Sequence, residues 1–269
     1  MTEIEEFTCL PKTLSLEDKQ RLQEQDSRLV TDFKASLLEK DARKHWDLFY
    51  KRNETRFFKD RHWTTREFTE LLNNQSTTKR VLFEIGCGVG NFIFPLVEEK
   101  LDFYIIACDL SSKAIEIVRR NELYNEEYMR AFQVDITTED ILNRVDANSV
   151  DIATLIFVLS AIHPDKFVTT LKVIHKVLKP GGILLFRDYG LYDMAQLRFK
   201  AGHKISNNFY MRQDGTRSYY FSVEFFSNLC LKAGFEVISN SYVHRKTVNK
   251  KENIDVPRIF IQAKIKKPS

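Results

Sequence analysis

The sequence predicts an α/β fold in which helices cover both faces of a mostly parallel, seven-stranded sheet. Two observations lead to this prediction. Short apolar runs alternate with amphipathic segments along most of the chain, and the run VLFEIGCGVGN at 81–91 places glycines directly after a strand. A buried strand that leads through glycines into an apolar helix is the usual start of a nucleotide-binding unit. Gly86, Gly88 and Gly90 would leave backbone N–H groups accessible to a ligand.

The segments that follow continue the alternation. The second strand, YIIACD, ends on Asp109, an acid placed to hold a ribose diol. The pair Ser111–Ser112 offers an N-cap to the amphipathic helix AIEIVRRN. The run AFQVDI is expected to be a third strand that ends in Asp135 and Ile136. Together these features indicate a cofactor of the adenosine type.

The second half of the sheet is predicted in the same way. Residues 149–162 give a fourth strand and its loop, and the helix FVTTLKVIHKVLKPGG is expected to stop at Pro180–Gly181. The fifth strand is ILLFRDYG. An insertion at about 190–221 contains a hairpin turned at Asp214–Gly215, and FEVISNSYVHRK and RIFIQAKIKK supply the last strand pair.

The spacing of the glycine motif separates the candidate cofactors. Dinucleotide sites read G-x-G-x-x-G, whereas this chain reads E-x-G-x-G-x-G, and no Lys-Ser/Thr follows as in a P-loop. The pattern resembles the first motif of class I S-adenosylmethionine-dependent methyltransferases, in which a helix ending LKPGG before a buried strand is frequent. The resemblance implies a Rossmann-like fold, S-adenosyl-L-methionine as cofactor and S-adenosyl-L-homocysteine as product.

The class I resemblance also implies the cofactor contacts. Glu84 would face the methionine ammonium, the three glycines would pass under the methionine and ribose, and Asp109 would take the ribose hydroxyls. Asp135 and Ile136 would contact the adenine. Ile156, at the end of the fourth strand, completes this part of the site.

Composition and cysteine usage limit the class of protein. The 269 residues, 43% of them hydrophobic, suffice for the core of one large domain with extensions. Cys9, Cys87, Cys108 and Cys230 show no C-x-x-C spacing, so no metal is expected and the thiols suit the cytoplasm or nucleus. No apolar stretch reaches membrane-spanning length, and the acidic start MTEIEEF is no signal peptide.

Charge is concentrated in one segment. Residues 42–68 hold eight Lys/Arg against four Asp/Glu, although the whole chain carries a net charge of only +4. Seven aromatic residues are interleaved there, including both tryptophans. Cations neutralise phosphates and aromatic faces stack on unpaired bases, so the segment suits looped RNA. The alternative is an amphipathic helical cap whose aromatics pack on the core while its cations are solvated.

The same segment carries a more specific resemblance. WDLFYKRN followed by RFFKDRHW, with the E-x-G-C-G-x-G-N start of the catalytic region, resembles the tRNA 3-methylcytidine methyltransferases from about residue 40 to the C-terminus. The resemblance implies that Trp46 and Tyr50 close over the cofactor. It also implies methylation of a cytidine in the anticodon loop of tRNA, with serine tRNA favoured and threonine or arginine tRNA as alternatives. Some members of the family are helped by a protein partner, for which a seryl-tRNA synthetase is a candidate.

Two parts of the chain supply the expected RNA contacts. The residues of the basic-aromatic segment are Arg56, Phe57, Phe58, Lys59, Arg61 and His62. Those of the insertion are Arg198, Lys204, Arg212 and Arg217. A solvated hairpin without contact to RNA is the alternative for the insertion.

The expected chemistry needs no general base, because N3 of neutral cytosine already carries a lone pair. Attack by C5 would require a cysteine after the fourth strand, and methylation of the adenine amino group typically uses an Asp/Asn-Pro-Pro-Tyr/Phe element there; the chain has Leu-Ser-Ala-Ile. Asp188, at the end of the fifth strand, is the first candidate for orienting the base, with Tyr189 beside it for stacking. The alternative for Asp188 is an acid that caps the next loop.

Two segments complete the predicted organisation. Residues 1–75 form a helical extension, in which Ser15 and Asp18 resemble a capping arrangement, and residues 76–269 form the catalytic domain. Two other functions fit the cofactor motif alone: methylation of a small molecule or a protein side chain, and a non-catalytic, cofactor-binding RNA-binding subunit.

Overall fold

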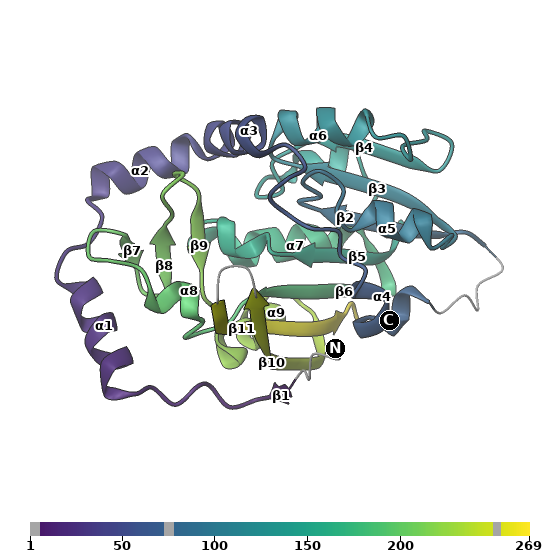
Figure 1. The fold of residues 1–269 in the computed structure, drawn as a ribbon. Coiled ribbons are helices and arrows are strands. Elements are labelled where there is room, and N and C mark those ends of the chain that lie inside the picture. Colours follow the sequence, from purple (N-terminus) through teal and green to yellow (C-terminus); the bar gives the residue numbers. More distant parts are fainter. Residues whose placement is uncertain (1–5, 73–77, 250–253) are drawn as a thin grey trace.

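The computed structural model describes residues 6–72, 78–249 and 254–269, and an eight-stranded sheet forms its centre (Figure 1). In spatial order the strands are β1 (Glu6–Thr8), β10 (Glu236–Asn249), β11 (Ile254–Lys266), β6 (Leu178–Tyr189), β5 (Val150–Ile156), β2 (Arg80–Ile85), β3 (Phe103–Asp109) and β4 (Met129–Gln133). The five strands from β6 to β4 are parallel, whereas β11, β10 and β1 pair antiparallel. The seven predicted strands are present, and the short N-terminal β1 adds an eighth at the edge.

The sheet is doubly wound, as its apolar runs predict. On one face β6 contributes Leu184 and Phe186 to a core with helices α7 (Phe167–Val177) and α9 (Val223–Lys232). On the other face Leu185 packs with α5 (Ile93–Glu98), α6 (Ser112–Arg119) and the short turns α4 (Thr64–Glu67) and η1 (Thr69–Leu71). Successive side chains of a strand point to opposite faces, so one continuous apolar run serves both cores.

The chain reverses its direction of travel across the sheet between β2 and β5. It runs from β2 outward to β3 and β4, then returns to place β5 and β6 on the other side of β2. Ligands of open α/β sheets bind at the carboxyl ends of the strands that flank such a reversal. The loops after β2 and β5 therefore define the expected site.

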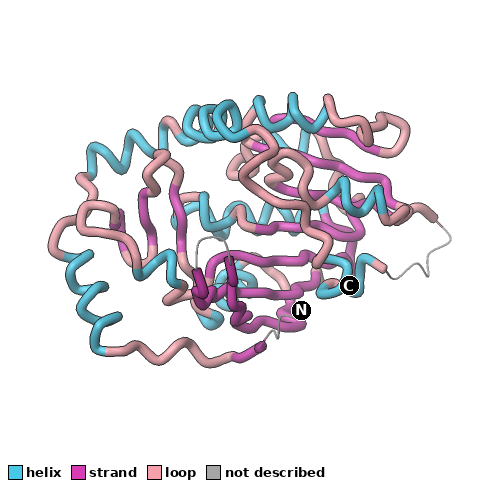
Figure 2. Tube along the Cα trace, viewed as in Figure 1, coloured by secondary structure: helices cyan, strands magenta, loops and turns pink. Residues whose placement is uncertain are grey.

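The N-terminal helices and the insertion lie at one end of the sheet (Figure 2). The helices are α1 (Leu16–Asp26), α2 (Asp32–Lys40) and α3 (Ala42–Asn53). The insertion contains α8 (Met194–Leu197) and a three-stranded sheet of β7 (Lys204–Ser206), β8 (Phe209–Met211) and β9 (Arg217–Tyr219). The predicted hairpin is thus part of a larger sheet, turned at Gly215 with φ +82°. Ser15 and Asp18 form the expected capping box of α1.

Two predicted boundaries are wrong by several residues. Helix α7 ends at Val177, so the LKPGG segment belongs to β6 instead of to the helix. An irregularity in the β5–β6 pairing, between Val150 and Ile152, accommodates this segment, and Gly181 adopts φ +77° there. The third parallel strand, β4, ends at Gln133, before Asp135 and Ile136, although the N–H of Val134 still bonds the Asp109 carbonyl at 3.0 Å.

The short helical turns after β5 are η3 (Leu159–Ala161) and η4 (Pro164–Lys166), and η2 (Glu139–Asn143) follows β4. Over the described part of the chain, the helices lack the length and apolar character needed to cross a membrane.

Candidate active site

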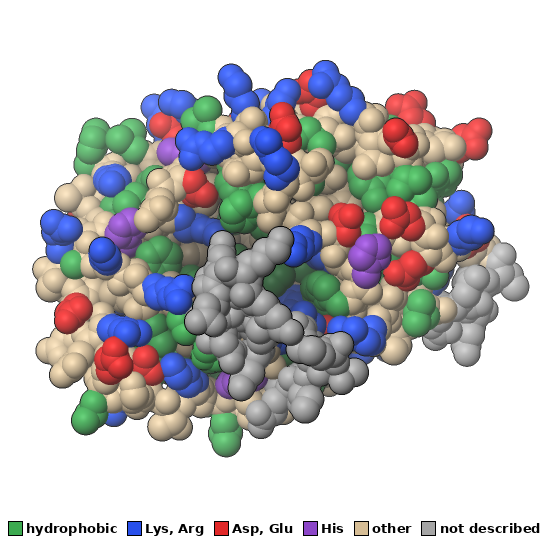
Figure 3. Space-filling view, in the orientation of Figure 1, with side chains coloured by type: hydrophobic (Ala, Val, Ile, Leu, Met, Phe, Trp, Pro, Cys, Tyr) green, Lys and Arg blue, Asp and Glu red, His purple; other side chains and the backbone are tan. Residues whose placement is uncertain are grey.

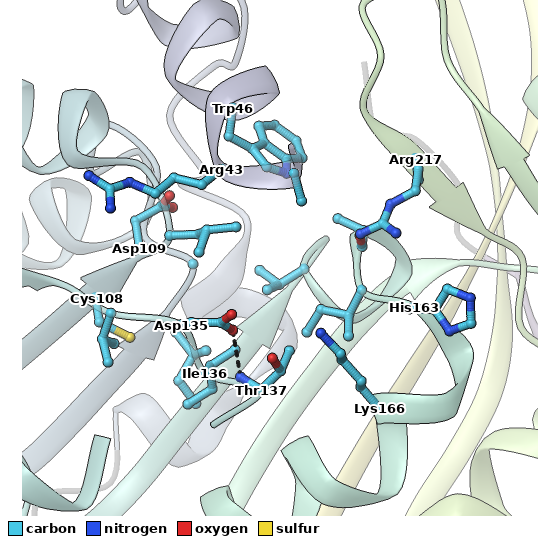
Figure 4. Close-up of a pocket in the computed structure, with 18 of the residues that line it drawn as sticks. Arg43, Trp46, Cys108, Asp109, Asp135, Ile136, Thr137, His163, Lys166 and Arg217 are labelled. Carbon is cyan, nitrogen blue, oxygen red and sulfur yellow. Dashed lines mark hydrogen bonds between the residues drawn. The ribbon is translucent and has the colours of Figure 1, made fainter. Parts of the chain in front are cut away.

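A pocket opens at the carboxyl ends of the parallel strands, where the sheet topology predicts it. The loops after β2, β3, β4 and β5 line one side, and α3 lies across the other (Figure 4). Trp46 and Arg43 project from α3, while His163, Lys166 and Arg217 stand opposite Asp109 and Asp135. The pocket is therefore built jointly by the sheet, the N-terminal helices and the insertion.

The glycine turn after β2 is shaped by close contacts. Gly86 and Gly88 adopt φ values of +68° and +54°, a region that residues with a Cβ rarely occupy. A Cβ on Gly86 would lie 2.4 Å from Val158 Cγ2, and one on Gly88 would lie 2.8 Å from the Tyr50 hydroxyl oxygen. The turn can thus approach both the β5 loop and α3 only because side chains are missing. Gly90 has φ +91° and closes the turn.

Asp109 stands at the end of β3 with both carboxylate oxygens fixed. The Gly88 N–H donates to Oδ2 at 2.9 Å, and the Ser111 N–H donates to Oδ1 at 2.8 Å. Burial raises the pKa of Asp109 to about 6, and the backbone N–H donors oppose that rise. A carboxylate oxygen can accept more than one hydrogen bond, so the side chain can still receive ligand hydroxyls.

Glu84 is the carboxyl at the bottom of the site. Its side chain is buried, and its Oε2 has no hydrogen-bond partner among the described residues. Burial raises its pKa to about 8, while nearby Arg61 opposes the rise. A buried carboxyl with an unsatisfied oxygen is costly unless a donor or cation completes it. The position suits a ligand ammonium group.

The remaining predicted cofactor residues fall into two groups. Asp135 and Ile136 line the pocket in the loop after β4, and Asp135 Oδ1 accepts the Thr137 N–H at 2.9 Å (Figure 4). Ile156 is buried in β5, and its carbonyl accepts from Arg61 Nη1 at 3.4 Å. Ile156 therefore lies behind the pocket wall, whereas the next residue, Phe157, lines it.

Helix α3 brings two aromatic residues over the turn. Trp46 and Tyr50 are four residues apart on one face, and their rings stack with centroids 6.0 Å apart. They pack with Phe49 against Val89 of the glycine turn and against α6. Both line the pocket, so the amphipathic-cap alternative describes this half of the basic-aromatic segment.

Phe157 joins the pocket to the end of β6. It adopts φ +59°, which is uncommon for a residue with a bulky side chain, and its N–H donates to the Arg187 carbonyl at 2.7 Å. Its ring packs on Tyr189 at 5.2 Å between centroids, and Arg61 lies over it at 5.6 Å. Arg61, predicted to contact RNA at the surface, thus faces inward. The sequence shows that Arg61 stands in a run of basic residues, but it does not show that the side chain faces inward.

Asp188 does not line the pocket. It is fully buried, with Oδ2 accepting the Ser160 N–H at 2.9 Å and Oδ1 accepting its neighbour Tyr189 N–H at 2.8 Å. Burial raises its pKa to about 7, and the bonds from Ser160 oppose that rise. Asp188 thus holds the loop after β5, whereas the alternative considered from the sequence was a cap on the loop that follows its own strand. Direct contact with a substrate does not follow from this geometry.

A graded pair of substitutions tests the role of Asp188. Asp188→Ala would leave two backbone N–H groups without acceptors, each at a cost of about 1–3 kcal/mol, and would lower both the thermal midpoint and kcat. Asp188→Asn keeps an acceptor and is expected to retain more of both. Differential scanning calorimetry and steady-state kinetics measure the two effects. Equal kcat for the alanine variant and the wild type would contradict the assignment.

A second opening, termed here the basic groove, separates α3 from the insertion. Its cationic side chains, with one histidine, are Arg52, Arg198, Lys200, His203 and Arg212. The aromatic residues Phe49, Phe57 and Phe199 line it as well. Figure 3 shows Lys and Arg side chains over α3 and the insertion on this face of the molecule. The groove thus joins three predicted RNA contacts, namely Phe57, Arg198 and Arg212, to residues that the sequence did not single out.

The other predicted RNA contacts lie outside the groove lining. Lys204 and Arg217 are buried and form ion pairs with Asp26 and Glu39, so these two cations fasten the N-terminal helices to the insertion. This burial argues against the predicted phosphate contacts for both. Phe58 is half-buried against Phe49. Of the remaining predicted contacts, Arg56, Lys59 and His62 are exposed.

The geometry fits one cofactor class. Three features follow one another around the pocket. They are the buried carboxyl of Glu84 with its unsatisfied oxygen, the glycine turn with no room for side chains, and Asp109, which is held at the end of the next strand. Within the described residues, no three His, Cys, Asp or Glu side chains are grouped so as to hold a metal. Fold and site together define a class I S-adenosylmethionine-dependent methyltransferase.

Comparisons with known proteins refine this assignment. A family model described as a methyltransferase domain matches residues 27–240. The mouse "tRNA N(3)-cytidine methyltransferase METTL6" is 55% identical over 259 residues, covering 96% of this chain and 92% of that protein. The fission yeast "tRNA N(3)-methylcytidine methyltransferase trm141" is 40% identical over 241 residues, covering 88% and 97%. The chain belongs to the tRNA N(3)-cytidine methyltransferase family.

Solved structures agree on the fold. A chain from the complex of the Haloferax volcanii Trm112 methyltransferase activator with a methyltransferase matches with a TM-score of 0.61 and 15% identity, over 84% of this chain and 97% of that one. The glycopeptide N-methyltransferase MtfA, solved with S-adenosylmethionine, matches with a TM-score of 0.53 and 13% identity, over 78% and 88%. At these identities the match supports the fold alone.

Proposed function

We propose that this protein transfers a methyl group from S-adenosylmethionine to N3 of a cytidine in tRNA. The observation that carries the proposal is the connection between the basic groove and the cofactor pocket. Arg212 of the groove lies near Tyr189, which, against the effect of burial, helps to raise the pKa of Arg212, and the Tyr189 ring packs on Phe157 of the pocket wall. The rings of Tyr189 and Phe157 would therefore lie between an RNA chain in the groove and the cofactor pocket, where the methyl group is transferred. The relatives named above are enzymes of this activity.

Some residues of the site would bind the cofactor, and others would orient the base and exclude water. Glu84 would bind the cofactor ammonium and Asp109 its ribose, while Asp135 and Ile136 would contact the adenine. When bound, the cofactor supplies an activated methyl group. N3 of neutral cytosine attacks without loss of a proton, so the protein needs to orient the base and to exclude water. Phe157 and Tyr189 present aromatic faces suited to that task.

The anticodon loop suits the proposed acceptor. N3 is paired in a duplex, so the enzyme must take a loop base or extrude one from a helix. The groove combines cations with aromatic side chains, a mixture that fits unpaired nucleotides better than a regular duplex.

We extend the proposal to serine tRNA, with a seryl-tRNA synthetase or another adaptor as an assisting partner. The cytoplasm, and also the nucleus, would be the place of action.

Nucleoside analysis tests the proposal. The purified protein is incubated with methyl-labelled S-adenosylmethionine and unmodified tRNA, and the digested nucleosides are identified by mass spectrometry. Labelled 3-methylcytidine is the expected product. A different labelled nucleoside, or label in protein or small molecules only, would contradict it. If nothing is labelled although calorimetry shows cofactor binding, adding cell extract separates a missing partner from a wrong substrate.

Removing two groove cations tests the RNA path. Arg52 and Arg198 are exposed on opposite sides of the groove, and Arg52→Ala/Arg198→Ala is expected to weaken binding of all tRNAs. The plot of log affinity against log salt should become shallower by about one for each lost phosphate contact. Filter binding over a salt series measures both. The matched control is Lys172→Ala/Lys232→Ala, which removes two exposed cations of α7 and α9. Equal losses in both double variants would contradict the proposed path.

A further inference from the structure

Asp47 of α3 forms a tertiary cap on another helix. Its Oδ1 accepts the Ser111 hydroxyl at 2.6 Å and the Lys113 N–H at 3.2 Å. The Ser112 hydroxyl approaches the same oxygen at 3.4 Å. These groups are the first residues of α6 and its N-cap, where backbone N–H groups have no partner within the helix. The cap therefore joins the N-terminal extension to the helix that begins directly after β3.

Ser111, which Asp47 bonds, is in turn hydrogen-bonded to a residue that is predicted to bind the cofactor. Ser111 donates its N–H to Asp109, and Asp109 also accepts the N–H of Gly88. Gly88 in turn faces the Tyr50 hydroxyl closely enough that a Cβ would collide with it. Tyr50 lies three residues after Asp47 on α3. Helix α3 thus meets both residues that donate to the Asp109 carboxylate: Asp47 bonds the Ser111 hydroxyl, and the Tyr50 hydroxyl lies close to Gly88.

The apolar contacts of α3 set its rotation about the helix axis only broadly, by turning one face toward the core. Phe49, Tyr50 and Trp46 pack on Val89 and α6 through non-directional contacts. The bonds of Asp47 are directional and short, and Asp47 is next to Trp46 in the chain. Fixing Asp47 therefore fixes which way the Trp46 ring faces. In Figure 4 that ring projects from α3 toward the pocket.

We propose that Asp47 is a positioning residue for cofactor binding, because its bonds to the start of α6 hold Trp46 and Tyr50 in place over the pocket. This inference rests on the proposed function only for the identity of the cofactor. Asp47 does not line the cofactor pocket, so it acts through α3 rather than by touching the ligand. Its loss would remove no residue of the pocket floor, where Glu84 and Asp109 lie, although, besides burial, the Asp47 charge is one cause of the raised pKa of Asp109.

Binding of S-adenosylhomocysteine by isothermal calorimetry tests the proposal without any RNA. Asp47→Ala is expected to raise the dissociation constant about 10-fold, the change that follows if α3 lies in its binding position in about one tenth of the unliganded molecules. Asp47→Asn keeps an acceptor oxygen and is expected to restore most of the affinity. The matched control is Asp41→Ala, six residues earlier, whose side chain makes no capping bond at the start of α3. Wild-type affinity in Asp47→Ala would overturn the proposal.

Two further readouts separate positioning from general stability. In the methylation assay, Asp47→Ala should raise KM for the cofactor while kcat and KM for tRNA stay near their wild-type values. A double-mutant cycle with Ser111→Ala should be non-additive, because each change removes the same 2.6 Å bond. Additive effects, or equal changes in both KM values, would overturn it. A protein that fails to methylate tRNA even with cell extract added, but shows these binding changes, would refute the proposed substrate and leave the role of Asp47 standing.

Discussion

Glu84→Gln is expected to weaken the affinity for S-adenosylmethionine by about 10- to 150-fold, the loss of a charged hydrogen bond of about 1.5–3 kcal/mol. Glutamine has nearly the same shape, and its amide oxygen can still accept a hydrogen bond from an ammonium group, but it cannot form an ion pair. The thermal stability of the variant should be unchanged or higher, because the buried carboxyl with its unsatisfied Oε2 is removed. Calorimetric binding and thermal unfolding should therefore change in opposite directions. Glu122→Gln, at an exposed acid, is the control and should alter neither.

The pH dependence gives this prediction a second test. Burial raises the pKa of Glu84 from its ordinary 4.5 to about 8. Because the folded-state value is the higher one, the stabilising contribution of the proton is complete below about pH 4.5 and is lost as the pH rises through about 8. Cofactor binding needs the carboxylate, so affinity should rise toward about pH 8, by up to about tenfold per pH unit. It should fall again as the ligand amine loses its proton, near its ordinary pKa of about 8.

The glutamine variant should lack the rising limb of this profile and keep the falling one. Parallel pH profiles of binding for the wild type and the variant would show that another group controls binding. Asp109, with its pKa raised to about 6, titrates at lower pH and would limit affinity only there. The two carboxyls can thus be distinguished by the pH at which affinity changes.

Local patterns predicted where the glycine turn and the acid of the candidate cofactor site lie in the fold. The apolar run before Gly86 gave β2, and the acid at the end of YIIACD gave Asp109, because strand ends and glycine turns depend on neighbouring residues. Their meeting in one pocket follows from the parallel topology. Asp188 shows the limit of this approach. Its place at a strand end was predicted, but only the structure shows that Ser160 and Tyr189 occupy both oxygens.

Long-range pairing accounts for most of what the sequence did not predict. Lys204 and Arg217 were predicted to contact RNA, yet each pairs with an acid 178 residues away. Strand β1 was not predicted for a similar reason, because its pairing with β10 joins residues that are more than 230 positions apart in the sequence. No periodicity within a window of the chain carries such information. A charged residue in a loop insertion can therefore be assigned to a surface or to a contact only from the fold.

Glu67 is expected to be the most stability-sensitive charge of the extension. Its carboxylate pairs with Arg187 of β6 and with Arg245 of β10, and the Glu67 and Arg187 side chains are only 5% and 1% exposed. Burial lowers the pKa of Arg187 to about 10, and Glu67 opposes that shift. Glu67→Leu would leave Arg187 buried without its carboxylate, at a cost of about 3–5 kcal/mol. For a chain of this size that corresponds to a fall in Tm of about 6–20 °C.

The controls separate the buried pair from surface charge. Arg66→Ala removes an exposed cation whose nearest nitrogen is 3.8 Å from Glu67, and should change stability by less than about 0.5 kcal/mol. The double variant Glu67→Leu/Arg187→Met should recover much of the loss, because the fully buried cation is removed together with its carboxylate, while Arg245 is more exposed. If Glu67→Leu and Arg66→Ala unfold at the same temperature, the pair contributes nothing.

Loss of the Glu67–Arg187 ion pair should also affect the active site, because the backbone of Arg187 is bonded to a residue of the pocket wall. The Arg187 carbonyl accepts the N–H of Phe157, and Arg187 also lies over the ring of Trp63, at 4.4 Å from its centroid. A displaced Arg187 would therefore disturb Phe157, which already holds an uncommon φ. Below its lowered Tm, Glu67→Leu should show reduced kcat with near-normal cofactor affinity, since Glu84 and Asp109 do not contact Arg187. Unchanged kcat at such a temperature would mean that the pair stabilises the fold without positioning the pocket wall.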